Sequence, residues 1–367
     1  MRRADVLVVG GGIAGLSVSW HLARAGVRVR LLEREPLLAS HASGRNAAIF
    51  RHVEQTPCHT ALALRSLHLL SELGLEEPIL RTGALYVAAR PAVTEFVATA
   101  QRAAVSCVSL HDRELSLCSP GLRARLSAAH VPGDGVLDIH AVCQTLARRA
   151  RSEGAVLEVG AEVLRVQTRA ERVTGVELAD GRVLASDVVL LAAGAWAADL
   201  GRGCGASLPL VPHRRHLALL EVSPGLSRGP LVWRLDPGGE VYFRPESGGM
   251  LVSPCDEQPW AAGVPPTELD TGALGLRLGA IAPSLARGAV RRAWACLRTQ
   301  TLDREPVIGE DPRCPGLFWL GALGGRGMTC GLAAGEVAAD CVLGRVHDFA
   351  RLAPSRCLRD GDADEAG

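Results

Sequence analysis

The chain has 367 residues, of which 48% are hydrophobic and 22% charged, a composition that fits a globular protein of about two domains. Its net charge of +1 gives no electrostatic attraction for nucleic acid. No apolar run reaches the roughly 18–20 residues of a membrane span, so we expect no transmembrane segment. The eleven cysteines contain no CxxC pair, which argues against a metal site and favours reduced thiols in a cytoplasmic protein.

The first predicted elements form a complete β-α-β unit. Val6–Val9 is a short apolar strand, GGGIAG follows at Gly10–Gly15, and Ile13–Ala25 has the apolar periodicity of a helix. A second strand, Val27–Leu32, ends at Glu33. This order of strand, glycine run, helix, strand and acid is typical of dinucleotide binding. Because the first strand begins so early, we expect no signal peptide.

Each residue of this motif has its own predicted role. Gly10 permits the tight turn, Gly12 lets the backbone approach a pyrophosphate, and Gly15 lets the helix pack closely on the sheet. The N-terminus of the helix offers free N–H groups and positive dipole to the phosphates. Glu33 would accept the ribose hydroxyls, and its charge disfavours the 2′-phosphate of NADP.

Helices and strands alternate through the next part of the chain, after an irregular segment at residues 37–57. Asp138 is the predicted N-cap of a helix that runs to Glu153, and Asp180-Gly181 predicts a hairpin turn. The other expected helices and strands are Thr60–Leu73, Gly83–Ala89, Pro91–Ala104, Ala155–Val159, Val163–Thr168, Val173–Leu178, Val183–Ala185 and Asp187–Ala192.

Strands dominate from Leu210 to Arg298, and the α/β pattern then returns. The expected elements are strands His216–Val222, Leu231–Arg234, Glu240–Arg244, Met250–Ser253, Val290–Leu297 and Leu317–Gly321, and helices Thr267–Leu278 and Thr329–Leu343. We expect the acidic tail from Arg359 to be disordered. The order predicts an α/β Rossmann-type nucleotide-binding domain interleaved with an α+β substrate domain of antiparallel sheet. We place the first at residues 1–81, 139–207 and 299–367, and the second at residues 82–138 and 208–298.

Motifs spread over nearly the whole chain carry a family resemblance. They are VVGGGIAGLS at Val8–Ser17, LLERE at Leu31–Glu35, HASGRNAAIF at His41–Phe50, LLAAGAWA at Leu190–Ala197, PHRR at Pro212–Arg215, VYFRPESGGMLVSP at Val241–Pro254, WACLRTQTLDREPVIG at Trp294–Gly309 and FWLGALGGRGMT at Phe318–Thr329. The chain resembles the D-amino-acid-oxidase family of FAD-dependent amine oxidoreductases, which includes glycine and sarcosine oxidases. Within that family it is most similar to D-arginine dehydrogenases and other D-amino acid dehydrogenases.

The resemblance implies that the dinucleotide is FAD, and the block His41–Phe50 favours FAD over NAD. The implied cofactor-binding residues are Gly10, Gly12, Ile13, Ala14, Gly15, Glu33, Arg34, Ala42, Ser43, Gly44, Arg45, Asn46, Ala47, Ala48, Ile49, Val163, Gly194, Gly324, Gly325, Arg326, Gly327, Met328 and Thr329. In this family the helix after the last glycine turn starts beneath the flavin ring, where its N–H groups stabilise reduced flavin. We expect non-covalent FAD, with a covalent link through Cys296 as the alternative, since sarcosine oxidases attach FAD to a cysteine near this point.

The resemblance also implies the reaction and the residues that hold the substrate. Arg298 and Arg215 would bind the carboxylate of an amino acid, because a guanidinium pairs with a carboxylate through two hydrogen bonds. Tyr242 matches a substrate-side tyrosine, and Gly325 belongs to the reaction site. Hydride transfer from Cα to flavin N5 would give an imine and then a keto acid and ammonia, with no strong base required.

The chain departs from the D-arginine dehydrogenases at three positions near the substrate. Ile49 stands where they have a histidine beside the flavin. Glu54 lies near the position of their tyrosine. Leu85 stands where they have a glutamate that faces the cationic side chain of the substrate. Glu54 could replace that acid or could be a solvated loop residue. His52 is a candidate proton acceptor, although a histidine in a loop is more often only exposed.

The absence of lysine predicts the kind of electron acceptor. All 40 basic residues are arginine, so the chain has no lysine to match the one that sarcosine oxidases place by the flavin for reaction with oxygen. The matching position is Thr329, and Arg51, His52 or Arg326 could substitute for the charge. We therefore expect a dehydrogenase that uses a quinone or another carrier, with oxygen as the alternative.

Three other functions stay open at this point. The same fold could oxidise a secondary amine such as sarcosine, or a 2-hydroxy acid. A protein of another class, which binds FAD without catalysis, is the third alternative. The carboxylate-binding motif at Arg298 argues against it, because a protein without a substrate has no use for such a group.

Overall fold

The computed structural model describes residues 4–358 except 76, 120, 124–125 and 266. Its first layer is a six-stranded sheet in the order β20-β21-β13-β1-β2-β9. The strands are β1 (Val6–Val9), β2 (Val29–Glu33), β9 (Val156–Val159), β13 (Val189–Leu191), β20 (Val307–Glu310) and β21 (Leu317–Gly321). All neighbouring pairs are parallel except β20 and β21. The predicted Rossmann-type order of a buried parallel sheet is therefore confirmed.

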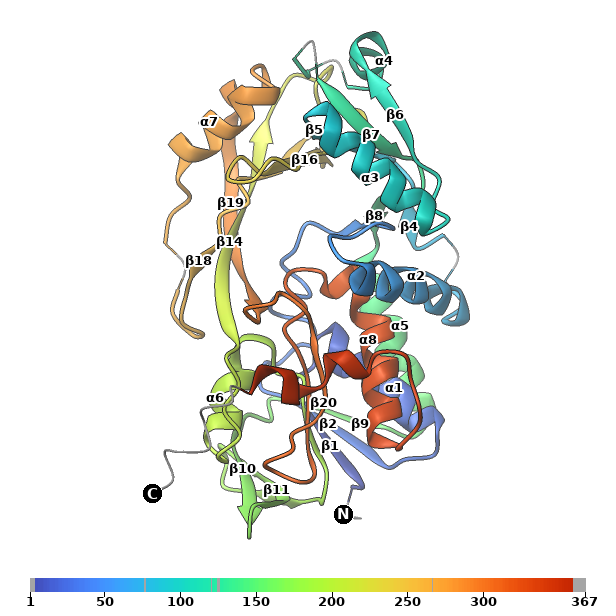
Figure 1. Ribbon diagram of the computed structural model, residues 1–367. Coiled ribbons are helices and arrows are strands. Elements are labelled where there is room, and N and C mark those ends of the chain that lie inside the picture. Colours follow the sequence, from blue (N-terminus) through green and yellow to red (C-terminus); the bar gives the residue numbers. More distant parts are fainter. Residues whose placement is uncertain (1–3, 76, 120, 124–125, 266, 359–367) are drawn as a thin grey trace.

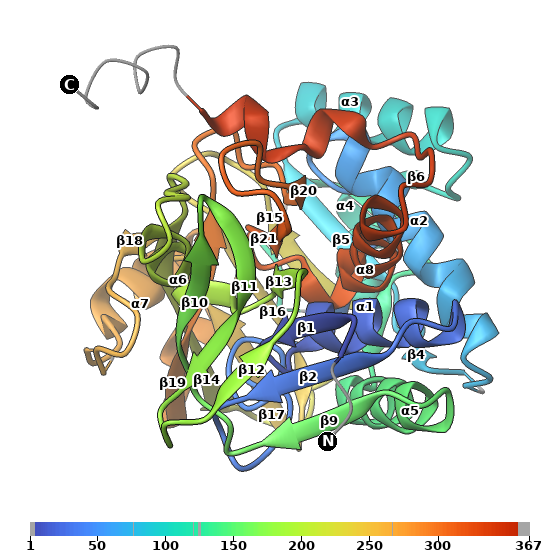
Figure 2. The same cartoon turned by 90° about the horizontal axis from the view of Figure 1, so that it is seen from below.

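Both faces of this sheet are covered, because each of its buried strands carries apolar side chains on both sides. Val6 and Val8 of β1 pack in a core with the helices, while Leu7 and Val9 pack in a second core on the opposite face. Figure 2 shows the helices on one side of the sheet and the hairpin strands on the other. The helices are α1 (Ile13–Arg24), α2 (Pro57–Glu72), α5 (Ile139–Ser152) and α8 (Gly327–Val342), and the opposite strands are β10 (Val163–Arg169), β11 (Arg172–Leu178) and β12 (Val183–Ala185).

The second large sheet has nine strands and forms the upper part of Figure 1. Its order is β18-β14-β17-β16-β15-β5-β7-β6, with β19 on the free side of β14. The strands are β5 (Ala84–Ala88), β6 (Val108–His111), β7 (Ser127–Val131), β14 (Val211–Glu221), β15 (Leu231–Arg234), β16 (Val241–Glu246), β17 (Gly249–Ser253), β18 (Gln258–Pro259) and β19 (Ala289–Gln300). The helices α3 (Arg90–Arg102) and α7 (Thr271–Ile281) pack on its two faces, and α4 (Asp112–Cys118) lies beside β6.

The long strands β14 and β19 pair along their whole length and reach from the upper layer toward the six-stranded sheet (Figure 1). A small third sheet joins β3 (Ile49–Phe50), β8 (Gly135–Leu137) and β4 (Ile79–Leu80), and the short helix α6 (Ala197–Arg202) follows β13. These elements surround the space in which the candidate site lies. No helix in the described part of the chain is long and apolar enough to cross a membrane.

Most of the predicted elements are present, several with the expected bounds. Leu231–Arg234 and Leu317–Gly321 match residue for residue, and Asp138 caps α5 through its side chain, which accepts the N–H of Ala141 at 2.9 Å. The sequence missed the strands β3, β4, β6, β7, β8, β18 and β20 and the helices α4 and α6, all of which are short. Short elements of small or mixed residues lack a measurable period.

One feature of the second sheet differs from the prediction. The sheet was expected to be antiparallel, but β5 and β15 are parallel neighbours. These strands are far apart in the chain, so no hairpin turn dictates their relative direction. The predicted disorder of the tail lies outside the described residues. The placement of the domain boundaries stays a prediction.

Candidate active site

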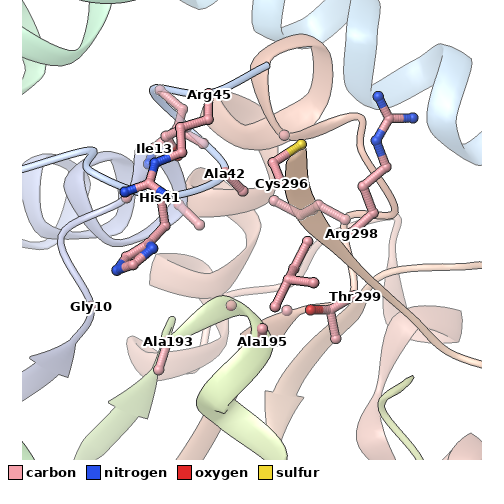
Figure 3. Close-up of a pocket in the computed structure, with 18 of the residues that line it drawn as sticks. Gly10, Ile13, His41, Ala42, Arg45, Ala193, Ala195, Cys296, Arg298 and Thr299 are labelled. Atoms are coloured by element: carbon pink, nitrogen blue, oxygen red, sulfur yellow. The ribbon is translucent and has the colours of Figure 1, made fainter. Parts of the chain in front are cut away.

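A cavity of about 560 Å³ lies between the carboxyl ends of the parallel strands and the nine-stranded sheet. Gly10 follows β1, Arg34 follows β2 and Ala193 follows β13, and all three line it together with Arg298 of β19. In Figure 3, Gly10 and Ala193 lie at one side of the view and Arg298 at the other. Ligands bind at this edge in open parallel sheets, and the volume is in the usual range of ligand pockets.

The N-terminus of α1 presents unpaired backbone donors to this cavity. Gly12 precedes the helix and has no side chain to cap it. The N–H of Ile13 donates to the Oγ of Ser43 at 3.0 Å. The N–H groups of Ala14 and Gly15 have no hydrogen-bond partner among the described residues. A helix start with free donors is a binding site for phosphate groups.

The glycines of the motif differ in what surrounds them. A Cβ atom at Gly15 would lie 1.9 Å from the carbonyl oxygen of Gly10, so the protein itself requires glycine there. A Cβ atom at Gly12 would have only one neighbour within 4 Å, the Oγ of Ser43 at 3.1 Å. The space beside Gly12 is therefore open to a ligand, as the motif predicts for the residue that faces a pyrophosphate.

The end of the cavity near β2 is lined by charged and aromatic side chains. Glu33 accepts the N–H groups of Gly11 at 2.6 Å and Glu35 at 2.9 Å, which fixes its carboxylate. The Arg34 guanidinium lies 3.8 Å from the ring centroid of Trp196. Such a stack is a cation–π contact and gives this end of the cavity a flat aromatic wall.

The N-terminus of α8 is the second helix start at the cavity. Gly327, Met328 and Thr329 line it, and α8 has no side-chain cap. The N–H groups of Gly327 and Met328 have no partner within the part of the chain that the structure describes. The Oγ1 of Thr329 lies 3.4 Å from the carbonyl oxygen of Ile49. The helix therefore offers a positive dipole and two free donors to a ligand.

Arg298 forms the centre of the other end of the cavity. Its guanidinium Nη2 donates to the hydroxyl of Tyr242 at 3.4 Å, and its remaining donors have no partner among the described residues. Burial raises the pKa of Tyr242, so the hydroxyl stays protonated. A Cβ atom at Gly325 would lie 2.6 Å from the Cδ of Arg298, and Gly325 has a φ of +82°. Gly325 thus leaves the space that the arginine side chain occupies.

Glu54 also lines this end, but it does not face the cavity as a free acid. Its buried carboxylate accepts hydrogen bonds from Arg51 and from Arg326, with the Nε atoms of both arginines at 3.1 Å. Arg51 also stacks on Trp233, with its guanidinium carbon 4.2 Å from the ring centroid. Two cations therefore already compensate the charge of Glu54. Leu85, at the position of the family's other acid, is buried in the core beneath the sheet.

Two of the predicted substrate residues lie away from the cavity lining. Arg215 is buried, and its Nη2 pairs with the carboxylate of Glu257 at 2.7 Å. His52 pairs through Nδ1 with Asp134 at 2.7 Å. Strand pairing places Arg215 opposite Cys296, which is two residues from Arg298 along β19. The roles suggested for Arg215 and His52 stay predictions.

Most of the predicted cofactor residues come together around the cavity. Those that line it are Gly10, Gly12, Ile13, Ala14, Glu33, Arg34, Ala42, Ser43, Arg45, Asn46, Ala47, Ile49, Val163, Gly194, Gly324, Gly325, Gly327, Met328 and Thr329. The others, Gly15, Gly44, Ala48 and Arg326, do not line it. Cys296 lines the cavity and is buried, with 7% of its surface exposed, so both the non-covalent and the covalent mode of attachment stay predictions.

Several lining residues were absent from the predicted set. Trp196 could have been found, because it closely follows a parallel strand whose carboxyl end adjoins that of β1. Trp233 carries no local signal, since its position depends on the pairing of distant strands. Arg51 was predicted only as a possible charge for the reaction with oxygen and not as a residue of the substrate end. His41 joins the Trp196 cluster, with the two ring centroids 4.7 Å apart.

The comparisons with known proteins agree with this geometry. A family model described as FAD dependent oxidoreductase matches residues 5–341. The chain belongs to this family. Mitochondrial dimethylglycine dehydrogenase of Rattus norvegicus is 30% identical over 294 residues, which cover 72% of this chain and 33% of that protein. Glycine oxidase of Geobacillus kaustophilus is 27% identical, with 93% of each chain covered.

A similar solved structure is the L-proline dehydrogenase of P. horikoshii, with 20% identity, 97% of this chain and 98% of that chain covered, and a TM-score of 0.84. At this identity the likeness shows the fold alone. The chain spans about a third of the length of the dimethylglycine dehydrogenases that it matches and 40% of the sarcosine dehydrogenases.

The residues of this FAD-dependent family member fit the cofactor. The open face of Gly12 and the free N–H groups of α1 suit a pyrophosphate, and Glu33 suits the adjoining ribose. The free N–H groups at the start of α8 suit the electron-rich edge of a flavin.

Proposed function

We propose that this chain oxidises the amine of a small amino acid, with a D-amino acid as the preferred substrate. The supporting observation is Arg298, whose half-buried guanidinium has a single hydroxyl partner in the same cavity as the two helix N-termini. A carboxylate would complete the hydrogen bonding of this side chain with two parallel contacts. Arg298 and Tyr242 then hold the substrate, and bound FAD supplies the hydride acceptor.

In this scheme the protein's own side chains position the substrate and neutralise the charge of its carboxylate. Arg298 fixes the carboxylate, the Tyr242 hydroxyl donates a hydrogen bond to one carboxylate oxygen, and Gly325 leaves the space that this contact needs. Neither His52 nor Glu54 is needed as a base, because a neutral amine can lose its Cα hydrogen as hydride. The resulting imine hydrolyses in water to a keto acid and ammonia.

Oxidation of a secondary amine is the second candidate, since relatives named sarcosine dehydrogenase match most of the chain. Product analysis separates the two functions. A primary amino acid releases ammonia, whereas an N-methyl amino acid releases formaldehyde. Ammonia formed in proportion to the oxidised substrate supports the first candidate. Formaldehyde from N-methyl substrates alone would replace it with the second.

We further propose a dehydrogenase that passes electrons to a quinone or another carrier. Oxygen must first accept one electron from the reduced flavin and become superoxide. A fixed positive charge beside the flavin stabilises the superoxide and so speeds the reaction with oxygen. The chain has no lysine, Arg51 and Arg326 are paired with Glu54, and His52 is paired with Asp134. In stopped-flow mixing, substrate-reduced protein should reoxidise slowly in oxygenated buffer and rapidly with a quinone or dye. Fast reoxidation with stoichiometric hydrogen peroxide would identify an oxidase instead.

A further inference from the structure

Four side chains form a continuous row at the substrate end of the cavity. Arg51 stacks on Trp233 at 4.2 Å, the ring centroids of Trp233 and Tyr242 are 4.6 Å apart, and the Tyr242 hydroxyl contacts Arg298. Trp233 and Tyr242 are directly opposite each other on β15 and β16, so the sheet fixes the spacing. All four residues line the cavity. The row therefore has a guanidinium at each end and two aromatic rings between them.

This end of the cavity carries more positive than negative charge. Arg51 and Arg326 share the carboxylate of Glu54, and the charge of the buried Asp134, which is bonded to His52 and Tyr86, also acts on Arg51. Arg298 adds a third guanidinium, and no described acidic side chain pairs with it, so three guanidinium groups stand against two carboxylates. The Nη1 of Arg51 also has no partner among the described residues, because Glu54 takes only its Nε and Nη2. Partly buried cations with unused donors are stabilised by anionic partners.

The charges of this row disfavour a substrate with a cationic side chain. A cationic side chain, such as that of arginine, needs an acid that is free to pair with it. Glu54 already has two guanidinium partners, and the Leu85 position offers none. A further cation here would meet like charge at both ends of the row, which is unfavourable.

We propose that the substrate is an amine with two carboxylates, either an acidic amino acid or an N-carboxymethyl amino acid. One carboxylate binds Arg298 and Tyr242, the second binds Arg51, and the carbon chain between them lies along Trp233. Arg51 is then the residue that determines specificity, held in position by Glu54 and Trp233. This inference rests on the proposed function, because an acidic amino acid belongs to its first candidate and an N-carboxymethyl amino acid, which is a secondary amine, belongs to its second.

The first test compares matched substrates on the unmodified FAD-bound protein. Aspartate is paired with asparagine in both chiral forms, and iminodiacetate with sarcosine, and kcat/KM for flavin reduction is measured for each. The dicarboxylic member should react about 10- to 100-fold more efficiently, the range expected for one hydrogen bond to a charged group. Equal efficiencies for both members of each pair would overturn the proposal.

The second test replaces Arg51. Arg51→Met should abolish most of the preference between paired substrates, read as the ratio of the two kcat/KM values within the variant, and Arg51→Lys should keep part of that preference. Arg65→Met is the matched control, since Arg65 is also ion-paired, with Glu336 on the surface, and does not line the cavity. A preference that survives in Arg51→Met would contradict the assignment.

A binding measurement separates this inference from the proposed function. Succinate and butyrate are titrated against the visible spectrum of the bound flavin, without turnover. Succinate should bind about 10-fold or more tightly, and this difference should disappear in Arg51→Met. If no amine reduces the flavin but succinate still binds preferentially, the proposed function fails and the two-carboxylate site stands. Equal binding of the two acids would overturn the site.

Discussion

Replacing Gly12 with valine should abolish FAD retention and leave the protein folded. The open space beside Gly12 meets only Ser43 within 4 Å, so the protein itself tolerates some added volume. A branched side chain would, however, occupy the position of the pyrophosphate and cover the free N–H groups of α1. We therefore expect a colourless protein with a normal circular dichroism spectrum.

The measurement is the ratio of FAD to protein after purification and again after addition of FAD. Acid precipitation shows whether any retained flavin is covalent, which also tests the alternative link through Cys296. Gly275→Val is the matched control, because Gly275 lies on α7 and a Cβ atom there meets nothing within 4 Å. A full complement of non-covalent FAD in Gly12→Val would show that the pyrophosphate lies elsewhere.

Arg298→Ala should weaken the binding of amino-acid substrates by about 2–5 kcal/mol, the cost of removing one partner of a desolvated charge pair. FAD content should change little, because the residues expected to hold the cofactor, at Gly12, Glu33 and the start of α8, lie elsewhere in the cavity. Arg298→Lys should recover only part of the affinity, since an ammonium group cannot form two parallel contacts with a carboxylate.

The observable is the substrate dissociation constant from the rate of anaerobic flavin reduction at increasing substrate concentration. Arg304→Ala is a suitable control, because this arginine pairs with Glu257 near the site and does not line the cavity. Unchanged substrate affinity in Arg298→Ala, with normal FAD content, would make Arg298 a structural residue and displace the proposed carboxylate site.

The sequence predicted the cofactor end of the cavity better than the substrate end. Gly10, Gly12 and Glu33 belong to one local β-α-β unit, in which spacing along the chain determines spacing in the structure. Trp233 reaches the cavity only because β15 pairs with β16 and with β5, which comes from a remote segment. No local pattern reports such a pairing.

The charges at the substrate end show the same limitation. Glu54 and His52 both looked like candidates for polar roles in an irregular loop. The fold brings Arg326, 272 residues away, to Glu54 and brings Asp134, 82 residues away, to His52. Whether an acid is free or paired depends on such distant contacts, which the motif alone does not contain.

Anaerobic mixing of the FAD-bound protein with amines tests the central claim most directly. The panel pairs D- and L-amino acids and N-methyl amino acids with the amines of the same skeleton that lack the carboxylate. Our account predicts that the visible absorbance of the flavin is lost with at least one carboxylate-bearing amine and with none of its decarboxylated counterparts. A flavin that dithionite reduces but no amine reduces, or one that both members of a pair reduce equally well, would contradict it.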